Sequence, residues 1–484
     1  MTIYRDIKIL FLTSVIICFC AYAKDTTTPS KPIFVVKQKP ALGPQLKKTP
    51  VERLDKANPG ILNAIKGSTP GGEAAEDEDW EEKVVPVVKG KSTELSRDVA
   101  DMGSGLQDVM QKHNFTWSGH PYSIQGLPIL YTSKSTGFNM GVRLSLADLK
   151  SEDPFTYLIT FQFWATDRGA KNHEVSLDVP EFFSRHWRLR IGYKYPEVID
   201  HNYFGIGNNS IYDKDLTDPQ NPRFISRQYY QYVFIYPCFT FDLFYKFFRE
   251  KLSVFGSIGI DKAAIRPHDL DNTSKMFVEK PYGSAGGKTN YIKGGLEYDS
   301  RNYPLNPSKG IVLAGIYTNH SKSMGSDYQY SSVDLMYMGF FSFLKYFVLG
   351  HRIMVDQTWG DLPFFALARF NSYDNYEGLG GGDTLRGAPT FRFIDNLKFI
   401  NQIEIRTRFY NGVVFGQHME VFLVPFWDMG RVWDRNKKLT FDQLHNTLGN
   451  EFRFTWNSTF IASFTMGFSH DAISTYLSFG ESFD

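Results

Sequence analysis

The feature that most constrains this chain is a regular alternation of apolar and polar residues, which begins near Tyr122 and continues to the C-terminus. Between residues 138 and 146, Phe, Met, Val and Leu fill the even positions, whereas Asn, Gly, Arg and Ser fill the odd ones. Similar segments follow at 155–166 and 187–195. Because successive side chains of a strand point to opposite faces of a sheet, each segment has one apolar and one polar face. The pattern predicts an all-β domain.

The length of these segments indicates which solvent they face, since alternation alone would also suit a water-soluble sandwich. Many segments reach the roughly ten residues of a tilted membrane-spanning strand, whereas strands of globular proteins usually have about five or six. In one segment Arg188, Arg190 and Lys194 share a face. Such a charged face is tolerable if it lines a water-filled lumen. The apolar faces are therefore expected to contact lipid.

The number of segments completes the fold prediction. We count about sixteen, starting at 138–146 and including 226–236 and 239–248 as separate strands, and an even count suits a closed bacterial barrel. We predict a transmembrane antiparallel β-barrel of about sixteen strands over residues 121–484. The aromatic content of 16% would supply the aromatic girdles of such a barrel. The net charge of +1 argues against a general nucleic-acid-binding protein, which would need a basic face.

The N-terminus has the pattern of an export signal. Arg5 and Lys8 precede a short apolar core at 9–20, and small residues follow it. Cleavage after Ala23 would make residues 1–23 a signal peptide. An uncleaved anchor is the alternative, although the apolar core is short for a membrane span.

Residues 24–120 differ in composition from the rest of the chain. They are rich in Pro, Lys, Thr, Gly and acidic residues, with an acidic run at 76–82. Such a segment cannot bury enough apolar surface to offset the entropy cost of ordering it, so we predict a mostly disordered polar tether. Apolar residues at helical spacing within 93–113 indicate either a short helix of the tether or a helix that plugs the lumen. The tether would also offer a binding segment to a periplasmic partner.

One connection is much longer than a turn. It lies between residues 359 and 398 and contains a Gly-rich run at 377–387. Loops of this length without regular structure are usually functional or disordered. The strand expected after the loop places Glu404 on its polar face, and the next strand does the same with Asp428. If the loop folds into the lumen, Arg386 at its tip would meet both carboxylates.

These residues carry a resemblance to a known family. The sequence LRG at 385–387, followed by FWDMG at 426–430, resembles the barrel domain of the Omp85 superfamily. This is the bacterial surface antigen family of outer-membrane assembly factors and secretion pores. Three further stretches follow the family order: YFGIGN at 203–208, GGLEYDSR at 294–301 and YLSFGESF at 476–483. The resemblance extends over about residues 120–484 and implies localisation in the outer membrane of a Gram-negative-type bacterium.

The resemblance also implies roles for individual residues of the inward loop. It implies that Arg386, followed by Gly387, anchors the loop by pairing with Asp428, and that Glu404 is a second acceptor. The strand motif of the family corresponds here to Phe426, Asp428 and Gly430. The chain departs from the family at Ala388, where members usually have an aromatic residue.

At the C-terminus, the resemblance implies a last strand that directs its own membrane insertion and closes weakly against the first strand. The residues of this insertion signal would be Tyr476, Leu477, Phe479 and Phe483. The chain ends in Asp484 rather than in the aromatic residue of the signal.

Two functions remain open. The first is insertion or translocation of protein clients, either nascent barrels or secreted chains. The second is a passive pore or surface antigen, because residues 24–113 lack the apolar periodicity of the modules that receive clients by strand addition in the family. We expect no enzyme, cofactor or metal site: Gly90-Lys91-Ser92 lacks the first glycine of a phosphate loop, and His173-Glu174 lacks the second histidine of a zinc protease.

Overall fold

The computed structural model describes most of the predicted barrel and little of the predicted tether. The described residues are 34–38, 113–133, 136–150, 155–248, 251–268, 273–303, 306–344, 346–370, 378–414, 417–435, 440–456 and 460–479. The predicted signal peptide, the predicted helix within 93–113 except for its last residue, and Phe483 lie outside these ranges.

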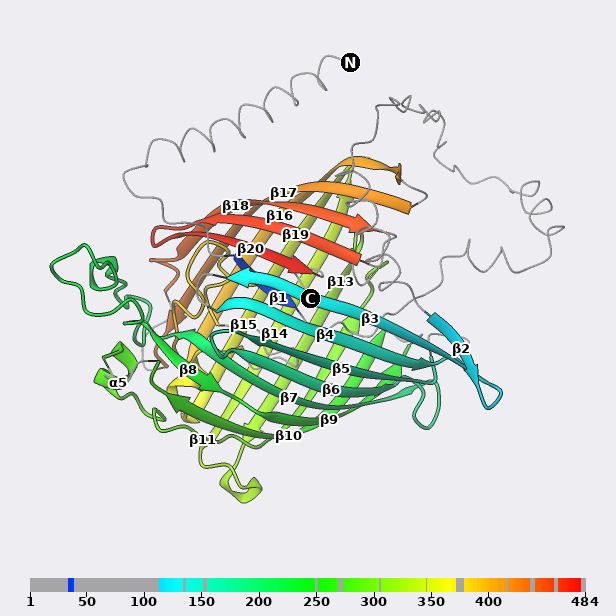
Figure 1. Ribbon diagram of the computed structural model, residues 1–484, viewed down its shortest axis with the longest axis horizontal. Coiled ribbons are helices and arrows are strands. Elements are labelled where there is room, and N and C mark those ends of the chain that lie inside the picture. The colour runs from blue at the N-terminus through cyan, green and yellow to red at the C-terminus, as the bar shows by residue number, and fades with distance from the viewer. Residues whose placement is uncertain are drawn as a thin grey trace, which may run out of the picture.

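The described residues form one large sheet that curves into a barrel (Figure 1). Its first ten strands are β1 (Phe34–Gln38), β2 (His113–Trp117), β3 (His120–Ser133), β4 (Gly137–Asp148), β5 (Tyr157–Thr166), β6 (Lys171–Val179), β7 (Trp187–Asn202), β8 (Gln231–Ile235), β9 (Cys238–Phe247) and β10 (Leu252–Arg266). The second ten are β11 (Gly287–Lys288), β12 (Tyr291–Asp299), β13 (Gly310–His320), β14 (Gln329–Phe343), β15 (Phe347–Asp361), β16 (Leu397–Val414), β17 (Gln417–Trp433), β18 (His445–Trp456), β19 (Phe460–Phe468) and β20 (Ile473–Phe479).

In the ranges given above, helical structure is confined to short pieces of the connections. These are α5 (Lys275–Glu279), α6 (Phe364–Leu367) and two 3-10 turns, Lys214–Leu216 and Lys322–Met324. Over the described ranges, no helix is long and apolar enough to cross a bilayer.

Counted over the described residues, the barrel wall has sixteen strands, which confirms the predicted fold class. β8 and β9 are two halves of one strand, because β7 pairs Lys194 with Cys238 and Glu197 with Ile235 in one continuous register. Pro237 between the halves has no N–H to donate. With β1, β2 and β11 set aside, sixteen strands remain. The predicted count agrees because two errors cancel: the prediction divides one strand into 226–236 and 239–248, and it omits β3.

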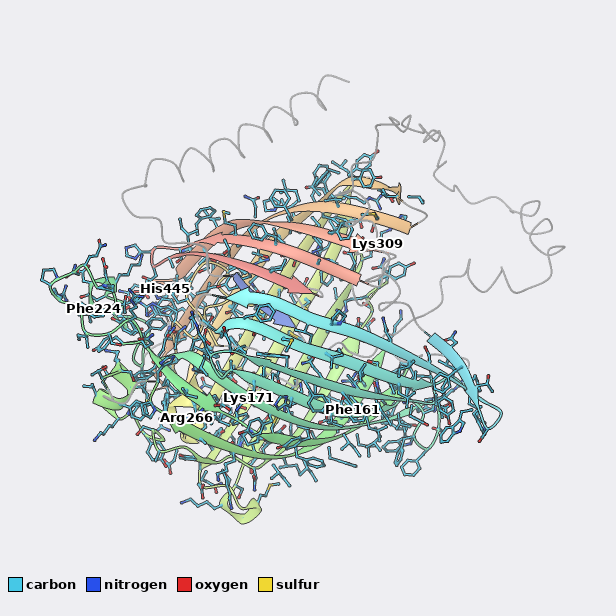
Figure 2. The ribbon with its side chains drawn as sticks, in the orientation of Figure 1. Phe161, Lys171, Phe224, Arg266, Lys309 and His445 are labelled. Carbon is cyan, nitrogen blue, oxygen red and sulfur yellow. The ribbon has the colours of Figure 1, made fainter. Side chains whose placement is uncertain are left out.

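Side chains alternate between the two faces as predicted, with charges on the inside. In β10, Ile258 and Ile260 are 47% and 57% exposed, whereas Ser257 and Asp261 are 4% and 5% exposed. Figure 2 shows the side chains on both faces of the sheet, among them the outward Phe161. Several of the most deeply buried side chains are cationic, namely Arg352, Arg386, Lys398, Arg406 and Arg453. Apolar surface outside and charge inside reverse the pattern of a soluble protein, as in a membrane barrel.

The two ends of the barrel differ in the length of their connections. At one end, which we call the short-turn end, no connection exceeds the ten residues of 300–309. The longest connections lie at the other, the long-loop end, and they cover residues 203–230, 267–290, 362–396 and 434–444. Phe224, labelled in Figure 2, lies in the connection that projects farthest from this end.

The seam between the first and last strands of the wall differs from the other strand contacts. β3 pairs with β2 and β4, and β20 pairs with β19. Within the described residues, no ladder joins β3 directly to β20. Instead, β1 lies parallel to β20, with Phe34 opposite Thr475 and Gln38 opposite Phe479 (Figure 1). The sequence did not predict this strand, which falls within the predicted tether.

The outward face of β14 allows a test of membrane depth. Leu335 lies in the middle of this strand and is 55% exposed, whereas Leu344 lies just beyond its short-turn end and is 79% exposed. Leu335→Arg should lower the free energy of unfolding by about 2–4 kcal/mol, and Leu344→Arg by at most about 1 kcal/mol, because burying an Arg costs most at the bilayer midplane. Urea titration in lipid vesicles measures both. Equal losses would contradict a lipid-facing position for Leu335.

Candidate functional site

The connection between β15 and β16 crosses the inside of the barrel. Its first part contains α6, whose four residues are all buried in a cluster with Tyr232 and Phe234 of β8 and Tyr330 of β14. Its second part, residues 378–388, is called the loop tip here. Within the tip, the Thr384 hydroxyl donates to the Gly378 carbonyl at 2.8 Å and accepts from the Gly380 N–H at 2.9 Å. The tip therefore forms a closed turn of its own.

Arg386 of the loop tip binds two carboxylates from adjacent strands. Its Nε donates to Asp428 Oδ2 at 2.9 Å and its Nη2 to Asp428 Oδ1 at 2.7 Å. The backbone N–H of Arg386 also donates to Asp428 Oδ2, at 3.0 Å. Its Nη1 donates to Glu404 Oε2 at 3.0 Å. The structure thus brings together the three residues that the sequence analysis singled out, with a bidentate pairing that fixes both distance and orientation.

Arg386 is part of a larger buried group of charges. Arg406 Nε and Arg453 Nε donate at 2.8 Å to Glu404 Oε1 and Glu451 Oε1 respectively. Arg386 Nη1 lies 3.9 Å from Glu451 Oε2. We call these six residues the charge cluster: Arg386, Glu404, Arg406, Asp428, Glu451 and Arg453. Each is at most 1% exposed, and three positive charges balance three negative ones. This balance matters because an unpaired charge at such a depth would be very costly.

The other two residues of the strand motif contact the loop tip directly. Phe426 and Gly430 lie on the same face of β17 as Asp428, since they are separated by two residues each. The guanidinium carbon of Arg386 lies 3.7 Å from the centre of the Phe426 ring, which is a cation–π contact. A side chain at Gly430 would lie 2.6 Å from the Leu379 Cδ1 atom of the loop tip. Each motif position therefore shapes the surface that receives the loop.

Glycines allow the loop tip to lie against the barrel wall. Gly387 has φ +141°, a conformation that other residues rarely adopt. On the facing strand β19, a Cβ at Gly467 would lie only 1.8 Å from the Arg386 carbonyl oxygen. Contact this close requires glycine at position 467, a residue to which the sequence pattern gives no role.

Sequence reasoning missed part of the site. Glu451 and Arg453 were not singled out, although both lie at inward positions of β18 and the parity of that strand could have identified them. Gln402, on the same face of β16 as Glu404, donates to the Thr384 carbonyl at 2.6 Å and accepts from Arg352 Nε at 2.7 Å. Such contacts join strands and loop across the lumen, so no sequence periodicity reports them.

The predicted insertion-signal residues have different surroundings. Tyr476 is 5% exposed, and its hydroxyl donates to the Ala388 carbonyl inside the barrel at 3.3 Å. Leu477 is half-buried on β20. Phe479 is the last residue of that strand, and Phe483 lies outside the described residues. An aromatic residue thus contacts the loop tip beside Ala388. It is Tyr476 of the last strand, whereas family members usually have the aromatic residue at the position of Ala388 itself.

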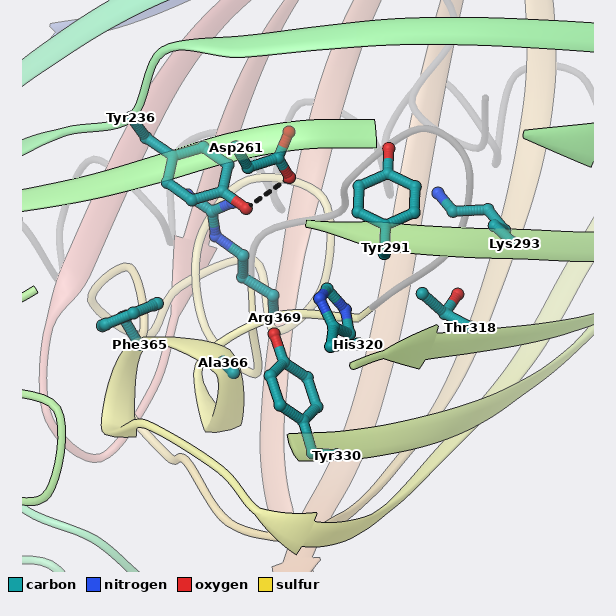
Figure 3. A pocket seen from close by; sticks show the side chains of 10 residues that line it. All are labelled: Tyr236, Asp261, Tyr291, Lys293, Thr318, His320, Tyr330, Phe365, Ala366 and Arg369. Atoms are coloured by element: carbon teal, nitrogen blue, oxygen red, sulfur yellow. Dashed lines mark hydrogen bonds between the residues drawn. The ribbon is translucent and has the colours of Figure 1, made fainter. Parts of the chain in front are cut away.

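A second polar site lies where the same loop meets the opposite wall (Figure 3). Arg369, just after α6, reaches toward Tyr236 and Asp261, and its guanidinium carbon lies 4.0 Å from the Tyr236 ring centre. The Tyr236 hydroxyl donates to Asp261 Oδ2 at 2.7 Å. Asp261 Oδ1 and His320 Nε2 also line this pocket, and neither has a hydrogen-bond partner among the residues that the structure describes. Arg386 and Arg369 therefore hold the loop on two sides of the lumen.

Two other inward acidic residues have basic partners nearby. Asp299 accepts from its neighbour Arg301, with Nη2 to Oδ2 at 2.9 Å. Glu174 lies 3.9 Å from the Lys194 ammonium group. In the part of the chain that the structure describes, no group of three or more side chains has the arrangement of a metal site.

Comparison with known proteins gives the following matches. The family model of the Omp85 superfamily domain matches residues 167–464. No curated protein sequence matches the chain. Among solved structures, BamA from Haemophilus ducreyi lacking POTRA domains 1–3 is similar at 13% identity and TM-score 0.49, over 80% of this chain and 77% of that one. CdiB from Escherichia coli is similar at 11% identity and TM-score 0.48, over 79% of this chain and 69% of that one.

Removing the positive charge of the loop tip tests the charge cluster. Arg386→Met should lower the free energy of unfolding by about 3–5 kcal/mol, because it leaves buried carboxylates without their partner. The matched control is Arg223→Met, since Arg223 also pairs with two aspartates but its side chain is 60% exposed. The control should cost less than about 1 kcal/mol. Urea titration in detergent micelles distinguishes the two, and a similar small loss for both would mean that the loop tip is solvated.

A second variant tests the close approach of the loop tip to β19. Gly467→Ala should destabilise the barrel by about 1–3 kcal/mol, because the new methyl group would displace the Arg386 carbonyl. Gly256→Ala is the control, since a Cβ at Gly256 of β10 would meet nothing within 4 Å. Thermal unfolding followed by gel mobility measures both variants. A Gly467→Ala barrel as stable as the control would show that the loop tip does not lie against β19.

Proposed function

Because the chain belongs to the Omp85 superfamily, and is therefore an outer-membrane barrel, we propose that it takes part in inserting proteins into this membrane or in moving them across it. The clients are nascent barrels or secreted chains that present an unpaired strand. The long-loop end faces the cell exterior, following the rule that outer-membrane barrels have long outer loops and short periplasmic turns. The proposal includes no enzymatic step.

The seam is the observation that carries this proposal. A static pore needs every strand edge paired within the membrane, because unpaired backbone groups are costly in lipid. In the described part of this barrel, β3 and β20 are not joined by a ladder. β2 pairs with residues 120–124 on the seam side of β3, and residues 125–133 present an edge there. An exposed strand edge is a template for adding another strand. A client strand would form backbone hydrogen bonds with this edge.

The loop between β15 and β16 supports the same function over the passive pore. It extends from the cluster around α6 to the charge cluster, which lies at the wall formed by β16, β17 and β18. A free path for solutes would have to pass this loop. A periplasmic partner bound through residues 24–120 would bring clients to the short-turn end.

A reversible seal of the seam tests the proposal. Cysteines at Ser123, Gln125 or Ile129 of β3 are each combined with Ser478→Cys of β20 in a Cys238→Ser background, and the pair that forms a disulfide is kept. The oxidised barrel should lose client assembly, and reduction should restore it. Assembly is measured as the amount of folded client barrels in the outer membrane.

The control disulfide joins Ser463 and Ser478, whose hydroxyls are 2.6 Å apart across the β19–β20 pair. It leaves the seam free and should leave assembly intact. Full client assembly by a completely sealed seam would contradict the proposal. If the sealed and unsealed barrels conduct ions equally and no client is ever found, the passive pore is the better account.

A further inference from the structure

The hairpin formed by β19 and β20 carries hydroxyl groups that bond to the inserted loop. Ser474 Oγ donates to the Gly387 carbonyl at 3.1 Å, and the Tyr476 hydroxyl donates to the Ala388 carbonyl at 3.3 Å. Ser469 Oγ lies 2.9 Å from the same Gly387 oxygen. Two successive carbonyls of the loop thus receive donors from the last strand and from the turn before it.

An ion pair adds to these bonds at the turn of the hairpin. Arg392 is 4% exposed, and its Nε donates to Asp471 Oδ2 at 2.6 Å. Its Nη1 and Nη2 donate at 2.7 Å to the hydroxyl and carbonyl oxygens of Ser210, in the connection between β7 and β8. A single buried guanidinium therefore connects the inserted loop, a second long connection and the turn that leads into β20.

The packing between loop and hairpin is also close. A Cβ at Gly382 would lie 3.2 Å from the Tyr476 ring, and one at Gly387 would lie 2.8 Å from the Gly467 carbonyl carbon. Tyr476 lies opposite Thr465 of β19, whose hydroxyl donates to Glu451 of the charge cluster at 3.3 Å. The inward face of the hairpin is thus continuous with the surface that receives Arg386.

From these contacts we propose that the loop between β15 and β16 is a latch on the last strand. The latch consists of Gly387, Ala388 and Arg392 on the loop, and of Asp471, Ser474 and Tyr476 on the hairpin. It holds β20 from inside the lumen. In the described residues this strand has no ladder to β3, the first strand of the wall. β20 leaves the seam when the loop releases these groups.

The latch is distinct from the anchoring of Arg386. Arg386 binds carboxylates of β16 and β17, whereas the latch bonds end on the β19–β20 hairpin. The loop therefore connects the charge cluster to the seam strand. This is a property of the barrel alone, so it can be tested without any client and stands or falls separately from client insertion.

Hydrogen exchange on the folded full-length barrel tests the latch. Tyr476→Phe combined with Ser474→Ala removes two donors and keeps the ring and the fold. Exchange of the peptide 473–479 should become about tenfold faster or more, because each lost hydrogen bond allows β20 to open more often. Peptides of 417–433 should keep their protection, since the Arg386 contacts remain.

The matched control is Tyr317→Phe with Ser331→Ala, which removes a hydroxyl pair 3.2 Å apart on the outer side of β13 and β14. It should leave exchange at 473–479 unchanged. Asp471→Asn is a second latch variant that keeps the side-chain shape and should also accelerate exchange there. The proposal is overturned if neither latch variant changes exchange at 473–479, or if exchange at 417–433 rises by the same factor.

Discussion

The rest of this structure depends on the neutralisation of buried charge inside the barrel. Three arginines of the charge cluster face its three carboxylates, and each of the six residues is at most 1% exposed. The residues are Arg386, Arg406, Arg453, Glu404, Asp428 and Glu451. Such an arrangement is stable only when every charge has its partner and its hydrogen bonds. Arg386 comes from the loop and the other five residues come from the wall. The buried charges of the wall are therefore balanced only when the loop lies inside the barrel. The loop is therefore a structural part of the barrel.

This dependence links two features that would otherwise be separate. The loop crosses the lumen, and its continuation from Gly387 to Arg392 reaches the hairpin that borders the seam. A change at the seam strand must therefore break bonds to the loop, and a displaced loop would leave β20 with fewer contacts. An ordinary pore has no need for a strand held in this way. A barrel that adds and releases client strands needs such a strand, because an edge left open would pair with other chains.

Much of the fold could be predicted from sequence because lipid and water impose opposite requirements on the two faces of each strand. The same parity identified Glu404 and Asp428 as inward residues, and the loop length pointed to Arg386. Parity could not show that β8 and β9 form one strand, since Pro237 interrupts the pattern while the register continues. Nor could it show the contacts of Tyr476 and Arg392, because hydrogen bonds between the inserted loop and distant parts of the chain follow no sequence periodicity.

The most direct test of the central claim is a double-mutant cycle between loop and wall. Arg386→Met and Asp428→Leu are measured singly and together by urea titration of the refolded barrel. If the pair is buried as described, each single change costs about 3–5 kcal/mol. The double change should then cost at least about 2 kcal/mol less than the sum of the two, because the residues share one interaction. Additive losses would mean that Arg386 and Asp428 do not meet, and that the loop is not anchored inside the barrel.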